Sequence, residues 1–454
     1  MQLDFINKSV LAMMVAFVSV NASGNNVPDK ISTAEAITDI DSLVSYIEGV
    51  EVEPYANLSR DVFMAAVERE KSAFPADSVD KGSFFLTLSR LTGMFRQGHM
   101  GFIPDDNVFA DMEVFIPFSK LLSVSSADHK VSITTDTVVQ GVRVAKGMEL
   151  VSINGRNAVE MVDDYLPMVP CETNAFGCIG LSRSLGYYIA ASNPGITSYD
   201  VVLMRDGRKE HHKFKGVAAN DLISPAKEQS KPYDYSMLND SVMLFSFNSC
   251  WWNKDFSNFL RKMFKEANDN NVPHLIIDIR SNGGGNSSAG DEVCRFITGN
   301  AFNGFGGYKC RISRIVCENY NDKFEKDTIY SALGMDDLSL YLPYDEKYRY
   351  KGRTYLLIGP ATFSSAAKFS WAYKNFVDGL VIGEETGGVN ICVGDIVSAT
   401  LPNSGFRVML PWKVFYEYGA KDGDPIHGTL PDIAVPADEA LDRALQLIAA
   451  GGGE

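Results

Sequence analysis

The segment from residue 353 to 388 constrains the fold of this chain more than any other. It opens with an apolar run at 355–358 (YLLI), which has the length and composition of a buried strand. A Gly-Pro pair ends that run, and Ser364 and Ser365 then lead into a helical pattern. A second apolar run at 380–382 predicts another strand. Strand, helix and strand in this order predict an α/β unit, with the two serines where the first strand gives way to the helix.

Ser364 and Ser365 allow two interpretations. Serine is a common N-cap, whose hydroxyl accepts a hydrogen bond from a free N–H of the first helical turn. A serine at this place also suits nucleophilic chemistry, because the free N–H groups and the positive end of the helix dipole stabilise an anion that forms on a substrate carbonyl. Local sequence favours the cap, so the rest of the chain has to decide.

Length and charge exclude some classes of protein. A chain of 454 residues is expected to form two or three domains. Hydrophobic residues make up 45% and charged residues 22%, as in soluble globular proteins. Acidic residues exceed basic ones by 57 − 42 = 15, which argues against a nucleic-acid partner.

Residues 1–22 are expected to be a signal peptide. Lys8 precedes an apolar run at 10–20, and small residues follow at the spacing that a signal peptidase reads. A helix of that run would span roughly 16 Å, against about 30 Å of hydrocarbon, so no stable membrane insertion is expected. The sequence therefore predicts a periplasmic or secreted protein.

The seven cysteines have no CxxC spacing, which gives a zinc site little support. No metal or other cofactor is expected. Two interpretations of the cysteines stay open: local disulfides, as in an oxidising compartment, or buried free thiols. The pairs that suit a local disulfide are Cys171 with Cys178 and Cys310 with Cys317.

The chain divides into three regions after the signal peptide. Apolar residues at helical spacing predict an N-terminal helical domain over 33–110. Short strands follow over 113–217, where the INGR run resembles a PDZ domain, but a long insertion at 161–191 departs from that fold. From 235 to 450 strands alternate with helices, which predicts an α/β domain with a mostly parallel sheet.

Two further patterns suggest chemistry. His99 lies between two glycines where the helical domain ends, and connections of this kind carry sites more often than helix interiors do, although a surface histidine without a role is the plainer interpretation. The predicted strand at 274–279 ends in DIRSNGGG. Its glycines would let backbone N–H groups approach an anion or an oxyanion, while the missing GK[ST] lysine makes phosphate binding a weak alternative.

The motifs DIRSNGGG, TFSSAAKF, GEETGG, LPNSGFRVMLP and GTLPDIAV together resemble those of the S41 peptidases, the C-terminal processing and tricorn-core family. The resemblance covers nearly the whole chain after the signal peptide. It implies a crotonase/ClpP-like α/β core, with an N-terminal helical domain and an inserted PDZ-like β domain. No nucleic acid is implied as a partner, and the substrate would be a peptide or protein.

The resemblance also implies site residues. Ser364 matches the nucleophile, and the backbone N–H groups of Ser365 and Gly284 match the oxyanion hole. The processing-protease branch uses a lysine as general base, but Val389 stands at that position. The tricorn-like branch uses a histidine from the end of the helical region, which His99 matches.

The third catalytic residue is less defined. The tricorn-like branch has a carboxylate shortly before the PDI motif, and no glutamate stands there in this chain. Asp424 is the nearest acid, with Glu417 and Glu385 as alternatives.

We therefore expect an exported serine endopeptidase that cleaves peptides or protein tails through an acyl-enzyme. The alternative is a catalytically inactive protein that binds a peptide or ligand on the same scaffold. A crotonase-type acyl-CoA enzyme has no support, since export would separate it from its cofactor. The sequence indicates neither the cleavage specificity nor the oligomeric state.

Overall fold

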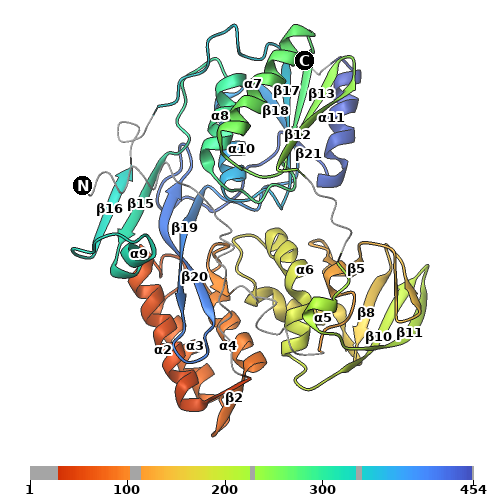
Figure 1. Cartoon of the computed structure of the whole chain (residues 1–454), viewed down its shortest axis with the longest axis vertical. Helices are drawn as coiled ribbons and strands as arrows, with labels where there is room; N and C mark the ends of the chain where they lie inside the picture. The colour runs from red at the N-terminus through yellow and green to blue at the C-terminus, as the bar shows by residue number, and fades with distance from the viewer. Residues whose placement is uncertain (1–28, 103–113, 225–230, 334–339, 452–454) are drawn as a thin grey trace.

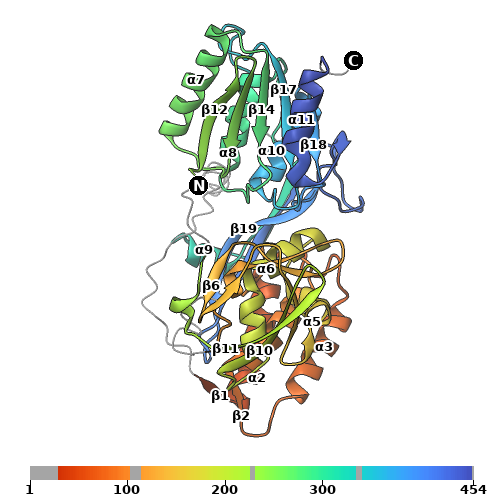
Figure 2. The same cartoon turned by 90° about the vertical axis from the view of Figure 1, so that its right-hand side faces the viewer.

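The molecule has two halves connected by a long pair of strands (Figures 1 and 2). The computed structural model describes residues 29–102, 114–224, 231–333 and 340–451. The predicted signal peptide and the last residues of the predicted helical domain, 103–110, lie outside these ranges. Among the helices that are described, none is long and apolar enough to cross a membrane.

The N-terminal half begins with helices that the apolar spacing predicted. They are α2 (Thr33–Val50), α3 (Arg60–Ser72) and α4 (Lys81–Gly93), with the short strands β1 (Lys30–Ser32) and β2 (Ser78–Asp80) paired beside them. Ser32 and Glu35 form a capping box that fixes the start of α2. Asp80 accepts a hydrogen bond from the N–H of Ser83 and starts α4.

An antiparallel sheet follows, with the strand order β11-β10-β8-β5-β4. Its strands are β4 (Leu122–Val124), β5 (Val131–Ile133), β8 (Glu149–Ile153), β10 (Ser198–Arg205) and β11 (Arg208–Lys215), with β9 (Arg156–Asn157) beside β8 and a separate hairpin of β6 (Thr137–Val139) and β7 (Val142–Val144). The predicted insertion contains most of α5 (Ala158–Tyr165) and all of α6 (Asn174–Ala191). The resemblance of this region to a PDZ domain stays a prediction.

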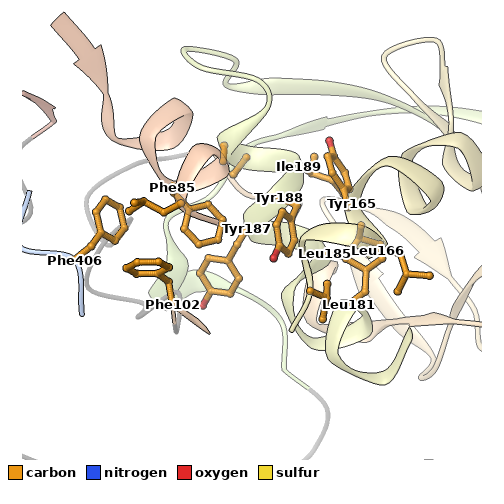
Figure 3. Close-up of a cluster of buried hydrophobic side chains, with 14 of the residues drawn as sticks. Phe85, Phe102, Tyr165, Leu166, Leu181, Leu185, Tyr187, Tyr188, Ile189 and Phe406 are labelled. Carbon is orange, nitrogen blue, oxygen red and sulfur yellow. The ribbon is translucent and has the colours of Figure 1, made fainter. Parts of the chain in front are cut away.

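Helix α6 connects the antiparallel sheet with the N-terminal helices. Figure 3 shows its Tyr188 between Tyr165 of α5 and Phe85 of α4. Phe85 in turn lies beside Phe406, whose ring is perpendicular to that of Phe102. One buried cluster thus holds the whole N-terminal half together.

The C-terminal half is a predominantly parallel α/β domain, as the alternating pattern predicted. Its strand order is β12-β13-β14-β17-β18-β21, parallel from β13 onward. The strands are β12 (Tyr233–Asn239), β13 (Val242–Phe247), β14 (His274–Asp278), β17 (Arg353–Ile358), β18 (Gly379–Gly383) and β21 (Ile433–Ala434). One face is covered by α7 (Lys254–Asp269), α8 (Ser287–Ile297) and α10 (Ser365–Phe376), and the other by α11 (Ala440–Ala449).

A further sheet connects the two halves. Its order is β16-β15-β20-β19, made of β15 (Gly307–Ile312), β16 (Thr328–Leu333), β19 (Ile391–Thr400) and β20 (Arg407–Tyr416), with α9 (Arg314–Asn319) between β15 and β16. In Figure 1, β19 and β20 run from the α/β domain down to the N-terminal helices. Strand β3 (Gly101–Phe102) pairs with β20, with Gly101 opposite Met409 and Phe102 opposite Val408. This pairing holds the segment after His99 against strand β20 of the connecting sheet.

All seven cysteines are free in the structure. Six of them are buried and Cys392 is half-buried. Of the two interpretations left open by the sequence, the structure therefore supports free thiols.

Candidate active site

Ser364 lies on a sharp turn between β17 and α10. The buried Thr362 anchors this turn, because its hydroxyl donates to the carbonyl of Ile279 at 2.9 Å. Ser364 has φ 51° and ψ −127°, a conformation that favours glycine and that costs a serine of order 1–3 kcal/mol. Its side chain makes no capping hydrogen bond to α10, which leaves the hydroxyl for another partner.

That partner is His99. Its Nε2 lies 3.1 Å from Ser364 Oγ, within hydrogen-bonding distance. The imidazole is 6% exposed and its ring stacks on that of Phe363, with centroids 4.7 Å apart. The structure thus brings together the two residues that the resemblance implied as nucleophile and base.

Burial sets the protonation state of His99. The loss of hydration lowers its pKa from 6.5 to about 4, so the imidazole is neutral at pH 7. A neutral imidazole whose Nε2 faces the serine is able to accept the proton of the hydroxyl. Nδ1 is buried and has no hydrogen-bond partner among the described residues.

The glycine loop after β14 packs directly beneath Ser364. Gly284 has φ 104°, and a Cβ there would lie 2.7 Å from Ser364 Cβ and 3.0 Å from the backbone nitrogen of Ser365. Only glycine allows this close approach. Asn282, fully buried, fixes the loop by donating to the carbonyl of Phe247 at 2.8 Å.

The two backbone donors implied for an oxyanion hole are in different states. Ser365 is the first residue of α10, so its N–H has no acceptor within the helix. The N–H of Gly284 already donates to Asn282 Oδ1 at 2.9 Å. It would have to release that acceptor, or share its proton, to bind a substrate oxygen.

The three acids considered from the sequence lie in different surroundings. Asp424 is exposed and accepts a hydrogen bond from the N–H of Lys421 at 2.8 Å within a turn. Glu385 accepts from the N–H of Gly428 at 2.7 Å. Glu417, just after β20, lines the same cavity as His99 and Ser364. Of the three, Glu417 is the one that the fold brings to the nucleophile.

Glu417 is an unusual carboxyl group. It is 3% exposed, and its Oε2 has no hydrogen-bond partner in the described ranges. Burial raises its pKa to about 8, although the nearby positive charge of Lys368 opposes the shift. A carboxyl group whose pKa is raised to near neutrality is typical of catalytic centres.

Lys368 is a cavity residue that sequence reasoning missed. It lies one helical turn after Ser364, a spacing that would have placed both side chains on one face of α10. Its ammonium group forms an ion pair with Asp291, and both side chains are buried. Val389, which the resemblance matched to the lysine base of processing proteases, is buried in a bridge to Gly428.

The cavity beside Ser364 is formed by the glycine loop, the start of α10 and strand β19. No group of three or more His, Cys, Asp or Glu side chains able to hold a metal ion occurs in the described part of the chain. The lining residues are His99, Gly285, Ser287, Phe305, Ser364, Ser365, Lys368, Cys392, Val393, Gly394, Asp395, Ile396, Phe415 and Glu417.

Comparisons with known proteins found a family match and similar solved structures. Residues 242–435 match the model of Peptidase family S41. Among solved structures, mature CPAF complexed with lactacystin is similar at 14% identity and a TM-score of 0.65, covering 92% of this chain and 98% of that one. Mature CPAF alone has a TM-score of 0.64 at 14% identity, with coverage of 92% and 97%. The photosystem II D1 C-terminal processing protease, also 14% identical, covers 93% and 98% with a TM-score of 0.41. None of the curated proteins matches this sequence.

Proposed function

This chain belongs to peptidase family S41 through residues 242–435, a family of serine peptidases, and we propose that it cleaves peptide bonds with Ser364 as nucleophile and His99 as general base. The observation that carries the proposal is the 3.1 Å distance between His99 Nε2 and Ser364 Oγ. The family match begins at residue 242, well after His99, so the proposed base comes from a part of the chain that the match does not cover.

The reaction follows from these positions. Ser364 Oγ attacks the substrate carbonyl carbon while its proton moves to His99 Nε2. The oxyanion of the tetrahedral intermediate accepts hydrogen bonds from the N–H of Ser365 and, once released from Asn282, from that of Gly284. The C–N bond then breaks, and His99 gives its proton to the leaving amine.

A water molecule completes the cycle. It gives a proton to His99 and attacks the acyl carbon. The ester bond to Ser364 then breaks, His99 returns the proton to Ser364 Oγ, and the new carboxyl terminus is released. We propose that the substrates are peptides or protein tails and that the protein acts on them as an endopeptidase.

We assign the third catalytic place to Glu417 rather than to Asp424. An ionised carboxylate in the cavity would stabilise the imidazolium that forms when His99 takes the serine proton. Glu417 lines that cavity, whereas Asp424 is exposed and accepts a turn N–H.

We also propose export, with residues 1–22 removed as a signal peptide. The support is the short apolar run after Lys8. N-terminal sequencing of the protein from fractionated cells would test this. A start near residue 23 in the exported fraction is expected, and an intact Met1 in the cytoplasm would contradict it.

The alternative function is a binding protein that has kept the scaffold. It is favoured by one observation, the buried Nδ1 of His99 without a partner among the described residues. Incubation of the purified protein with unfolded proteins, followed by mass spectrometry of new termini, separates the two functions. Cleavage that is lost in Ser364→Ala supports the peptidase, and stable binding without new termini supports the alternative.

A further inference from the structure

A segment of the insertion lies against the proposed catalytic pair. Thr173 caps α6, and Phe176 in its first turn stacks on Phe363 with ring centroids 4.1 Å apart and an angle of 12°. Phe363 also stacks on His99 and precedes Ser364. The start of α6 therefore contacts the turn that carries the nucleophile.

Glu172, just before this cap, reaches the loop that carries His99. A Cβ on Gly98 would lie 2.7 Å from Glu172 Oε2, so the carboxylate occupies the place where a side chain of residue 98 would be. Both carboxylate oxygens are buried without a hydrogen-bond partner of normal geometry among the described residues. The backbone N–H of Gly98 lowers the pKa of the Glu172 carboxyl group and so favours its ionised form.

The surroundings of Glu172 hold few charges. Burial raises its pKa to about 7, and the positive charge of Arg96 opposes this shift. Arg96 itself donates to Asn174 Oδ1 at 2.9 Å, so it ties the same loop to the first residue of α6. Burial raises the pKa of the Cys171 and Cys392 thiols, and the negative charge of Glu172 adds to both shifts.

Helix α6 is packed against its neighbours on two sides, and this packing fixes the position of Glu172 at its start. Leu181, Leu185 and Tyr188 are buried in the cluster of Figure 3. At the sheet, Ser182 Oγ accepts a hydrogen bond from the N–H of Val124, on the edge strand β4, at 2.8 Å. Because α6 is packed in this way, a carboxylate at its start is able to position the loop that carries His99. That loop is followed only by the short strand β3.

We propose that Glu172 is a positioning residue for His99. Its carboxylate holds the Gln97–Gly98 peptide, directly before His99, through the Gly98 N–H and so sets the imidazole against Ser364. The inference rests on the proposed function. It gives the insertion a role in the reaction, although Glu172 lies outside residues 242–435 and would not touch the substrate. Protonation of Glu172 would weaken this hold.

The test is the rate at which a fluorophosphonate probe labels the purified protein between pH 5 and 9, in wild type, Glu172→Gln and Glu172→Asp. A misplacement of about 1 Å can cost about 10²-fold in rate, so Glu172→Gln is expected to label at least tenfold more slowly at pH 9. The ratio of wild-type to Gln rates should grow as pH rises through about 7. Glu172→Asp should recover part of the rate because it keeps the charge.

The exposed Glu160 on α5 gives a matched control, since Glu160→Gln should label like wild type. Thermal unfolding of each variant separates a lost fold from a lost position. Equal rates and profiles for folded Glu172→Gln and wild type would overturn the inference while leaving the peptidase intact. Folded wild-type protein that never labels would instead overturn the proposed function.

Discussion

His99 Nε2 lies 3.1 Å from Ser364 Oγ although the two residues are 265 positions apart in the chain. Two features of the fold make this contact. The pairing of β3 with β20 holds the segment after His99, and the buried turn around Thr362 holds Ser364. The proposed site therefore forms only when the N-terminal half and the α/β domain are assembled together.

The glycine loop gives a sharp test of the geometry at Ser364. Gly284→Ala should slow probe labelling by about 10²-fold or more and lower the free energy of unfolding by about 1–3 kcal/mol, because the new Cβ would meet Ser364 at 2.7 Å and φ is 104°. Gly283→Ala is the control, since a Cβ there meets nothing within 4 Å. Labelling rates and urea unfolding would measure both effects. Identical behaviour of the two variants would contradict the described packing.

The choice of Glu417 over Asp424 can be tested by neutral substitutions. Glu417→Gln should lower the labelling rate by roughly 10–10²-fold at pH 9, where the wild-type carboxyl group is ionised, with the difference shrinking below pH 8. Asp424→Asn should label like wild type, because its side chain is exposed in a turn. The reverse result, a loss of labelling in Asp424→Asn alone, would identify Asp424 as the third catalytic residue.

Buried carboxyl groups predict how stability depends on pH. Burial raises the pKa of Glu51 and of Glu417 from 4.5 to about 8, so the folded protein keeps protons that the unfolded chain has lost. The stabilisation that these protonated groups give the folded state is full below pH 4.5 and is lost as pH rises through about 8. The free energy of unfolding should thus fall between pH 6.5 and 8.5, by at most about 1.4 kcal/mol per pH unit for each group.

His99 sets the lower limit of this pH range. Because its pKa is lowered from 6.5 to about 4, it makes the free energy of unfolding rise with pH below pH 6.5. Urea unfolding at pH 6.5 and 8.5 would measure the change. Glu51→Gln, a neutral side chain of the same shape, should reduce the decline, and the exposed Glu160→Gln should not. A stability that rises over this range in wild type would contradict the assignment.

The buried pair of Lys368 and Asp291 predicts a strong coupling. Lys368→Met leaves Asp291 buried without its counter-ion and should cost about 3–5 kcal/mol of unfolding free energy. The double variant with Asp291→Leu should cost much less than the sum of the two single changes. A double-mutant cycle by urea unfolding measures the coupling, and additive costs would show that the two groups do not stabilise each other.

Local sequence predicted some parts of this molecule well and others poorly. The turn at Ser364 was predictable because a buried strand, a Gly-Pro break and a helix follow one another directly. His99 needed the family resemblance, since its place beside Ser364 depends on β3 pairing with a strand more than 300 residues later. Pairings of that range leave no local pattern in the sequence.

The acids show the same limit. Asp424 was the nearest acid along the chain, but the cavity is lined by Glu417, which the end of β20 carries there. Glu172 had no signal, because its burial arises only when α6 meets the loop of Gly98. Lys368 did have a signal in the sequence, namely its helical spacing from Ser364. Periodicity normally assigns a residue at such a spacing to the solvent face or the core face of a helix.

The most direct test of the account is labelling of the purified protein by a fluorophosphonate probe, with Ser364→Ala and His99→Ala measured beside wild type. We predict that wild type is labelled, that Ser364→Ala is not, and that labelling of His99→Ala is slowed by about 10²-fold or more. Labelling that survives in Ser364→Ala, or folded wild-type protein that is never labelled, would contradict it.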